Sequence, residues 1–511
     1  MTSIPNLFSR SDYVLALPML VLSAFAVAIL LVDLLLPKEM KRWNAALALA
    51  GLAASGLSLA KVWTGMHLIA TNGTARFSGF LGSLVMDRFA IYFYLLFLMG
   101  AAVAVLMSVR YMEIEHEDHG EYYALILFAV VGMMCMASGF DLILLFVGLE
   151  LMALSTYVLV GFLRRDKRSN EAALKYLLLG AFSSGIFAYG LSLFYGITGS
   201  TNIGEIADKL AVRMANNPRD PIALLALITT ATGLLFKIAA VPFHQWAPDA
   251  YEGAPTAITG FMSVAVKAAG WAMLLRIFLF MLWPMRAQYT PMLIFVAVAT
   301  MIGGNFAALT QTNVKRLLAY SSIAHVGYML LGLVSSDGHN NSTGIKGILV
   351  YLLVYTFMNL GAFAVITSLR RRDIIGDELD DMAGLYYKAP SEAILLLVFL
   401  LSLAGIPPLA GFWGKYYIFL SLMETGHYIL AVVAVLFAVL GLYYYLRIAN
   451  AAFMRDAVYS EPVKIAPSLG MALWISALAT VGIGMFPELF LRVVNWSLAL
   501  SQDTKIIGLL R

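Results

Sequence analysis

Cysteine occurs only once in the 511 residues, as Cys135, so neither a disulfide framework nor a thiolate metal cluster is available. Charged residues are also scarce: they make up 13% of the chain, against roughly 25% in ordinary soluble domains. The seven histidines form no HxxxH or HExxH motif, and we expect no haem, iron–sulfur or zinc site in this chain. The net charge of +4 is too small and too scattered to indicate binding to nucleic acid. Together these absences argue against a water-soluble enzyme.

Apolar residues are abundant instead, at 61% of the sequence, and the mean hydropathy is +0.84. The apolar runs are continuous, whereas the strands of a membrane barrel would alternate. A bilayer core needs roughly 20 apolar residues of helix per crossing, so we predict an all-α polytopic membrane protein with about 14 transmembrane helices. The expected spans are 13–36, 44–64, 86–108, 123–140, 142–163, 173–197, 221–241, 256–283, 290–310, 317–335, 345–369, 391–421, 427–453 and 467–491.

These spans are expected to form one integral membrane domain, residues 1–511, because no long hydrophilic segment separates them. The seventh span ends at Pro242 and the Gly/Pro-bearing segment 247–255, and the twelfth is cut at 405–408. Paired broken helices in corresponding halves are typical of inverted-repeat transporters. We therefore predict two inverted five-helix repeats, spans 4–8 and spans 9–13. The parts of the domain are then 1–110 with three helices, 123–283, 290–453, and the last helix 467–491.

Lysine and arginine predict the orientation of the chain. The first apolar run is not expected to be a cleaved signal peptide, because it is long, lacks a basic n-region and is followed by Lys38, Lys41 and Arg42. Basic residues are more frequent after odd-numbered spans, notably in the segments 164–168 and 370–372. By the positive-inside rule, these loops face the cytoplasm and both termini lie outside.

Several ionisable residues lie within the expected spans: Glu150, Lys175, Lys237, Lys267 and Lys415. Each charge at mid-bilayer would cost about 2.5–3.5 kcal/mol if it faced lipid, so we expect these groups to face one another, the bundle interior or water. For Arg276, an alternative to burial is a position toward an interface, with its charged end in the headgroup region.

A proton relay is the functional interpretation of these charges. Burial disfavours a charged lysine, so its amine can be neutral part of the time, and a nearby carboxylate can switch the proton on or off. We expect Glu150 and Lys237 to form the switching pair, Lys267 to be the central carrier, and Lys415 to exchange protons with the outer side. The alternative is that these charges only hold helices together or line a vestibule.

Three further residues are secondary candidates for the relay. Lys175 is close to the start of its span, where it could equally extend its charge to the interface. His244 lies in the break after the seventh span and can titrate near neutral pH, although this segment could equally plug the end of the bundle. His325 lies mid-span beside Ser321 and Ser322, where we favour a relay role over a neutral, hydrogen-bonded core histidine.

Two segments resemble a known family. FKIAAVPFHQWAPDAYEGAPT (236–256) and VKRLLAYSSIAHVGYM (314–329) are similar to the antiporter-like subunits of respiratory complex I, and the resemblance covers nearly the whole chain. Lys415 stands where another branch of this family typically carries Glu. The chain also ends about twenty residues after the last expected span, without the long lateral helix of a third branch.

The resemblance implies a fourteen-helix, proton-translocating subunit of a bacterial inner-membrane enzyme, with no cofactor of its own. NADH, FMN, iron–sulfur clusters and quinone would bind elsewhere in the assembly. The partners would be the other membrane and peripheral subunits and the lipid bilayer. The family pattern assigns Glu150 and Lys237 as an ion pair, Lys267 as the central residue, Lys415 as the terminal one, and His325 as a polar position between two half-channels.

Two other functions share most of these features. The first is a subunit of a multi-chain sodium/proton antiporter or a membrane-bound hydrogenase, assemblies whose subunits carry similar motifs. The second is a structural membrane scaffold, in which the buried charges serve only helix packing.

Overall fold

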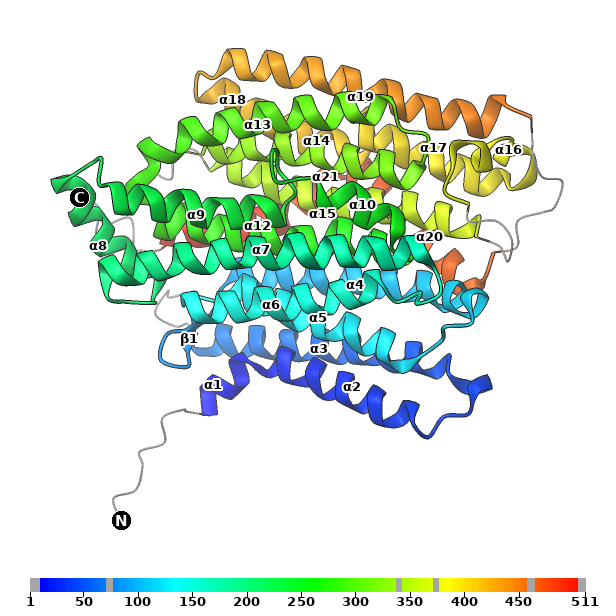
Figure 1. Ribbon diagram of the computed structural model, residues 1–511, viewed down its shortest axis with the longest axis horizontal. Coiled ribbons are helices and arrows are strands. Elements are labelled where there is room, and N and C mark those ends of the chain that lie inside the picture. The colour runs from blue at the N-terminus through cyan, green and yellow to red at the C-terminus, as the bar shows by residue number, and fades with distance from the viewer. Residues whose placement is uncertain (1–9, 70–76, 337–341, 371–375, 457–464, 504–511) are drawn as a thin grey trace.

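The computed structural model describes residues 10–69, 77–336, 342–370, 376–456 and 465–503. The chain forms a bundle of long helices whose axes run roughly side by side, from α2 at one edge to α19 at the opposite edge (Figure 1). Because a helix satisfies its backbone hydrogen bonds internally, such a bundle can cross the apolar part of a bilayer. Arg371 and Arg372, which contribute to the predicted orientation, lie outside the described residues.

The first half of the chain contains α1 Arg10–Leu15, α2 Leu17–Asp33, the 3-10 helix η1 Lys38–Met40, α3 Trp43–Ile69, β1 Phe77–Gly79, β2 Leu84–Met86, α4 Arg88–Glu115, α5 Gly120–Ser138, α6 Leu142–Val160, α7 Lys167–Thr198, α8 Ile203–Asn216, α9 Pro221–Lys237, α10 Trp246–Gly253 and α11 Thr256–Phe261. The second half contains the π-helix η2 Met262–Val266, α12 Lys267–Arg276, the π-helix η3 Ile277–Met281, the 3-10 helix η4 Trp283–Met285, α13 Arg286–Leu309, α14 Val314–Val334, α15 Thr343–Ser368, the 3-10 helix η5 Leu379–Met382, α16 Leu385–Lys388, α17 Pro390–Ala404, α18 Ala410–Glu424, α19 Tyr428–Met454, α20 Pro467–Met485 and α21 Pro487–Asp503.

The predicted all-helical membrane fold is confirmed. Within the described residues, eleven helices are long and apolar enough to cross a membrane, and Leu17–Asp33, Pro221–Lys237 and Pro390–Ala404 are shorter apolar helices. Each expected span overlaps one of these fourteen helices. The number of membrane crossings and the two inverted repeats stay predictions.

Both expected helix breaks are present. The seventh span ends with α9 at Lys237, and helical structure resumes with α10 at Trp246. The twelfth ends with α17 at Ala404 and resumes with α18 at Ala410. Each break leaves the last carbonyl groups of a helix without partners inside that helix. At the second break these carbonyls can hold a cation in the interior of the bundle, whereas at the first the carbonyls of Leu234, Leu235 and Phe236 accept hydrogen bonds from the chain that follows.

Three elements differ from the sequence-based expectation. The strands β1 and β2 pair as a short antiparallel hairpin, a small exception to the all-helical fold. The helix α8 lies between two expected spans and buries Ile203, Ile206, Leu210 and Met214, all on one face of the helix. The last expected span, 467–491, is divided, because α20 ends at Met485 and α21 begins at Pro487.

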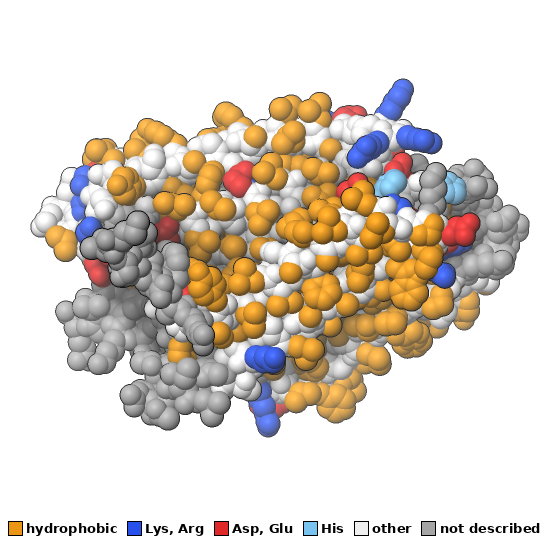
Figure 2. Space-filling view, turned by 90° about the horizontal axis from the view of Figure 1, so that it is seen from below, with side chains coloured by type: hydrophobic (Ala, Val, Ile, Leu, Met, Phe, Trp, Pro, Cys, Tyr) orange, Lys and Arg blue, Asp and Glu red, His pale blue; other side chains and the backbone are white. Residues whose placement is uncertain are grey.

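The surface of the bundle is apolar over a broad area. Exposed large hydrophobic side chains occur on many helices, among them Leu31, Leu178 and Leu436. In the face shown in Figure 2, hydrophobic side chains form a broad band, and several charged side chains gather toward the ends and edges. A soluble monomer rarely exposes so much contiguous apolar surface, whereas lipid or neighbouring membrane helices would cover it.

The helices α5 and α6 form a tight hairpin around Gly139. Asp141 starts α6 by accepting a hydrogen bond from the amide of Ile143. The two helices approach so closely that a Cβ on Gly132 would lie 2.5 Å from the backbone nitrogen of Met152. Glycine is therefore required at this crossing because no side chain fits between the backbones.

Arg276 is buried and does not lie at an interface. Its side chain is 1% exposed, and its Nη2 donates to Asp87 Oδ1 at 2.8 Å. Its Nε also donates to the carbonyl of Ala137. Asp87 in turn caps α4 by accepting from the amide of Ala90 at 2.7 Å. The arginine is not drawn to the interface because this carboxylate compensates its charge inside the bundle.

We expect Gly132→Ala to lower the stability of the chain by about 1–3 kcal/mol, because the added methyl group must push α5 and α6 apart. The measurement is the thermal unfolding midpoint in detergent, followed by intrinsic tryptophan fluorescence. Gly185→Ala on α7 is the matched control, since its Cβ would meet nothing within 4 Å. An unchanged midpoint for Gly132→Ala would contradict the proposed close crossing.

We expect Arg276→Met to destabilise the chain by about 3–5 kcal/mol, because it leaves the buried carboxylate of Asp87 without its partner. Adding Asp87→Asn should restore part of the loss, since Asn still caps α4 but carries no charge. The control is Arg110→Met, which removes a solvent-exposed pair with Glu113 and should leave the midpoint nearly unchanged. Equal midpoints for Arg276→Met and Arg110→Met would refute a stabilising role for the buried pair.

Candidate functional site

Lys237 is the last residue of α9 and lies beside the first helix break. Its side chain is buried, and Nζ donates to the hydroxyl of Tyr157 at 3.4 Å. Tyr157 belongs to α6, two helical turns after Glu150. Glu150 Oε1 is buried without a hydrogen-bond partner, and the carboxylate charge acts on Lys237. Within the described residues the two charges form no direct ion pair, and Lys237 instead contacts Tyr157, which lies on the same helix as Glu150.

Lys267 begins α12, directly after the π-helix η2. A π-helical turn widens the helix locally and often marks a functional position. The buried Lys267 Nζ donates to the hydroxyl of Ser322 on α14, and it lies 5.9 Å from the centre of the Tyr251 ring. In the described part of the bundle, no carboxylate forms an ion pair with this lysine. A hydroxyl and an aromatic ring thus surround its charge.

His325 lies one turn after Ser322 on α14. Its Nδ1 is hydrogen-bonded to the hydroxyl of Tyr351, and its Nε2 lies 2.9 Å from the hydroxyl of Tyr445. Tyr445 is also hydrogen-bonded to Ser321. Hydroxyl groups both donate and accept, so this buried network can shift its hydrogen bonds without moving a charged side chain.

Lys415, on α18, binds the end of a broken helix. Its Nζ donates to the carbonyls of Leu403 at 3.1 Å and Ala404 at 2.6 Å, the last two residues of α17. These carbonyls lack partners within α17 and carry the negative end of its dipole, so they stabilise a positive charge. Gly405 adopts a φ of +88°, and a Cβ there would lie 2.8 Å from Lys415 Cδ. The glycine both turns the chain and leaves room for the lysine.

One helix connects these groups. Along α14, Ser322 contacts Lys267, and His325 follows one turn later. The ring of Tyr328, one further turn along, lies 5.6 Å from Lys415 Nζ. The helix α14 is almost entirely buried. It therefore places a series of polar side chains between Lys267 and Lys415.

The other two candidates lie apart from this buried row. Lys175 on α7 is about half-exposed and forms ion pairs with Glu171 at 2.7 Å and Asp249 at 3.2 Å. His244 is partly buried in the break between α9 and α10, and its Nδ1 has no hydrogen-bond partner.

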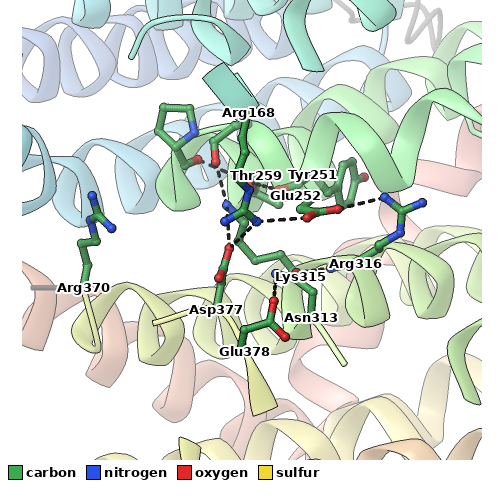
Figure 3. A network of polar contacts seen from close by, with 12 residues as sticks. Arg168, Tyr251, Glu252, Thr259, Asn313, Lys315, Arg316, Arg370, Asp377 and Glu378 are labelled. Atoms are coloured by element: carbon green, nitrogen blue, oxygen red, sulfur yellow. Dashed lines mark hydrogen bonds and ion pairs between the residues drawn. The ribbon is translucent and has the colours of Figure 1, made fainter. Parts of the chain in front are cut away.

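A network of ion pairs, defined by Arg168, Lys175, Asp249, Glu252, Lys315, Arg316 and Asp377, joins α7, α10, α14 and the segment before η5 (Figure 3). Arg316 binds Asp249 at 2.7 Å and Glu252 at 2.9 Å, while Arg168 binds Glu252 at 3.0 Å and Asp377 at 3.2 Å. Partial burial of Asp249 opposes its ionisation, but hydrogen bonds from Arg316 and Lys175 outweigh this effect and hold its pKa below the usual value. The network thus ties the two halves of the bundle together at one end.

The sequence contains local signals for this network. Asp249 and Glu252 are spaced i, i+3, which places both carboxylates on one face of α10. Lys315 and Arg316 open α14 within the segment that resembles the family. The contact between these two pairs and Asp377 depends on how distant helices pack, which spacing alone cannot reveal.

The geometry of broken helices and buried lysines agrees with the comparisons to known proteins. Residues 139–441 match the family described as NADH:quinone oxidoreductase/Mrp antiporter, TM. The chain is 88% identical to NADH-quinone oxidoreductase subunit N 1 of Koribacter versatilis over 511 residues, which cover 100% of both chains. It is 53% identical to subunit N 2 of Solibacter usitatus over 96% of this chain and 98% of that protein.

Solved structures agree with these relatives. A chain of respiratory complex I from Thermus thermophilus is 34% identical, with a TM-score of 0.77, over 93% of this chain and 98% of that one. A chain of the Mrp complex from Dietzia superposes with a TM-score of 0.82 over 98% of this chain and 100% of that one, but at 22% identity it supports only the fold. The resemblance seen in the sequence is thereby confirmed, including the branch indicated by Lys415. The chain belongs to the NADH:quinone oxidoreductase/Mrp antiporter family of membrane proteins, among the NADH-quinone oxidoreductase N subunits.

Proposed function

We propose that this chain is the proton-translocating membrane subunit of an NADH:quinone oxidoreductase, and that Glu150, Lys237, Lys267 and Lys415 carry the protons. NADH, FMN, iron–sulfur clusters and quinone belong to other subunits, whose redox reaction supplies the energy. The relatives named as N subunits support the assembly, and the buried lysines support the transport. We also propose that the two broken segments belong to inverted repeats, spans 4–8 and 9–13.

The observation that carries this proposal is the set of buried lysines, two of which, Lys267 and Lys415, contact side chains of α14. Lys237, Lys267 and Lys415 are 3%, 2% and 6% exposed, and hydroxyls, aromatic rings and backbone carbonyls surround them. A lysine serving only as an anchor would gain most from a close carboxylate, since unpaired buried charges are costly. A lysine with weaker partners can lose its proton, which transport requires.

Glu150 and Tyr157 would control the proton on Lys237. A charged Glu150 favours the charged lysine, and neutralisation or displacement of Glu150 would release the proton. Because no direct ion pair holds the two groups together, a small change at α6 or at a bridging water would suffice. Lys267 would then receive the proton, with the hydroxyl of Ser322 able both to accept and to donate.

His325 and its two tyrosines would transmit the change between Lys267 and Lys415. The histidine lies between them on α14, with both ring nitrogens hydrogen-bonded. Lys415 would leave the end of α17 when water molecules replace it as hydrogen-bond donors to the carbonyls there. His244 and Lys175 are secondary members of the path, at the helix break and at the ion-pair network.

We expect Lys237→Met and Lys415→Met to leave the assembly intact and to lower NADH-driven proton pumping severalfold, because Met fills the space but cannot carry a proton. The measurement is acidification of inverted membrane vesicles by a fluorescent dye, with NADH:ferricyanide activity as a measure of assembled complex. The control is Lys209→Met, which removes a lysine that only donates to the carbonyl of Thr198 at the end of α7.

Intact pumping in both lysine variants would contradict the relay and favour a purely structural role. The same vesicles test the antiporter alternative: a sodium gradient without NADH should move no protons through this chain. Sodium-driven proton movement that Lys237→Met abolishes would instead support an antiporter.

The orientation in the bacterial inner membrane is also part of this proposal, with both termini outside. On a Cys135→Ala background, Lys167→Cys at the start of α7 should react with a membrane-impermeant maleimide only in inverted vesicles. Arg219→Cys, in the segment before α9, should react only in right-side-out vesicles. Both positions are exposed. The reverse labelling pattern would overturn the orientation.

A further inference from the structure

We propose that Lys315 is a further proton-carrying residue, which exchanges protons between the ion-pair network and Lys267. The proposal rests on the proton-translocating function above and adds a residue to it. Lys315 is the second residue of α14 and lies between α10 and the segment that carries Asp377 (Figure 3).

The surroundings of Lys315 do not suit a permanent charge. Its side chain is 4% exposed, and it lies in the first turn of a helix, where the helix dipole disfavours a cation. Nζ donates to the carbonyl of Ala254 at 2.8 Å, while Asp377, the carboxylate that forms its ion pair, is 3.9 Å away. Arg168 lies closer to that carboxylate, at 3.2 Å. Lys315 can therefore release a proton without breaking a close ion pair.

The network gives Lys315 a connection to water. Arg168 is 38% exposed and Glu252 29%, whereas Asp377 is 3% exposed. Asp377 is thus paired both with Arg168, in the half-exposed part of the network, and with the buried amine of Lys315. The charged groups that act on Lys315 are Asp377, Arg168, Glu252 and Asp166, on three different elements. The proton would reach Lys315 along the carboxylates of Glu252 and Asp377 and the water between them, while Arg168 keeps its charge.

Toward the interior of the bundle, Lys315 is followed by Ser322 on the same face of α14. The two are seven residues apart, which is two helical turns and a rise of about 10 Å. Ser322 accepts the hydrogen bond of Lys267. Tyr251, next to Glu252, lies beside Lys267, and its buried hydroxyl has no hydrogen-bond partner among the described residues. Buried polar groups of this kind are where ordered water is found, and water is needed to cover this distance.

The transfer breaks and forms only bonds to hydrogen. An N–H bond of the Lys315 ammonium breaks as a bridging water takes the proton, and another proton of that water chain binds the neutral amine of Lys267. Lys315 is then a neutral amine held by its contact at Ala254. It regains a proton from water at Asp377, whose negative charge favours the ammonium form.

The test compares Lys315→Arg with Lys315→Met in the intact complex. Arginine keeps the positive charge and can still donate to Ala254 and Asp377, but it cannot release a proton in a protein. The measured quantity is the number of protons taken up per NADH oxidised. The part of this uptake that is lost in Lys267→Arg defines the share that depends on this path. We expect Lys315→Arg to lower that share at least about tenfold, since positioned proton-transfer groups contribute roughly 10²–10⁴-fold.

Lys209→Met again serves as the control for loss of a lysine-to-carbonyl hydrogen bond at a helix end. Normal pumping by Lys315→Arg, with Lys267→Arg impaired, would overturn the proposal and leave Lys315 a structural cation. Normal pumping by both arginine variants and by Lys237→Met would instead overturn the proposed function itself. If Lys315→Met fails to assemble, the arginine variant still decides between these outcomes.

Discussion

The cost of holding a lysine inside an apolar bundle is the constraint on which the rest of this structure depends. Each buried ammonium needs polar partners, and a continuous membrane helix offers none from its backbone. The broken helix α17 supplies them for Lys415, because it ends at Ala404 and its last carbonyls accept hydrogen bonds from Nζ, whereas Lys237, at the end of α9, donates to the hydroxyl of Tyr157. For Lys415 the break and the lysine are therefore one feature, because the ammonium and the last carbonyls of α17 satisfy each other.

The helix α14 connects three buried lysines, Lys315, Lys267 and Lys415. It begins in the ion-pair network with Lys315, contacts Lys267 through Ser322, and reaches the neighbourhood of Lys415 at Tyr328. Its contacts with α10, α13 and α15 bury it on all sides. A shift or rotation of this single helix would change several proton sites together, which is what coupled transport requires.

The sequence predicts the helices and their breaks well because these depend on local composition. The length of an apolar run determines whether its helix can span the membrane. Glycine and proline at 405–408 interrupt a helix regardless of its surroundings. The buried residues Lys237, Lys267 and Lys415 are also predictable, since a charge inside such a run needs an interior position. Their partners are not: Tyr157 is 80 residues from Lys237, and Ser322 is 55 residues from Lys267. Periodicity cannot specify which helices meet, so the network at Asp377 and the burial of Arg276 emerge only from the packing.

The two kinds of buried cation in this chain have different surroundings, and the difference follows from their chemistry. Arg276 cannot lose its proton, and it is bound directly to a carboxylate, Asp87, at 2.8 Å. The buried lysines contact hydroxyls, rings and backbone carbonyls, and even the ion pair of Lys315 is long and shared with Arg168. A permanent charge requires a permanent partner, whereas a group that alternates between charged and neutral forms must be tolerated in both. The distribution of close carboxylates therefore separates the cation that holds helices together from the lysines that can carry protons.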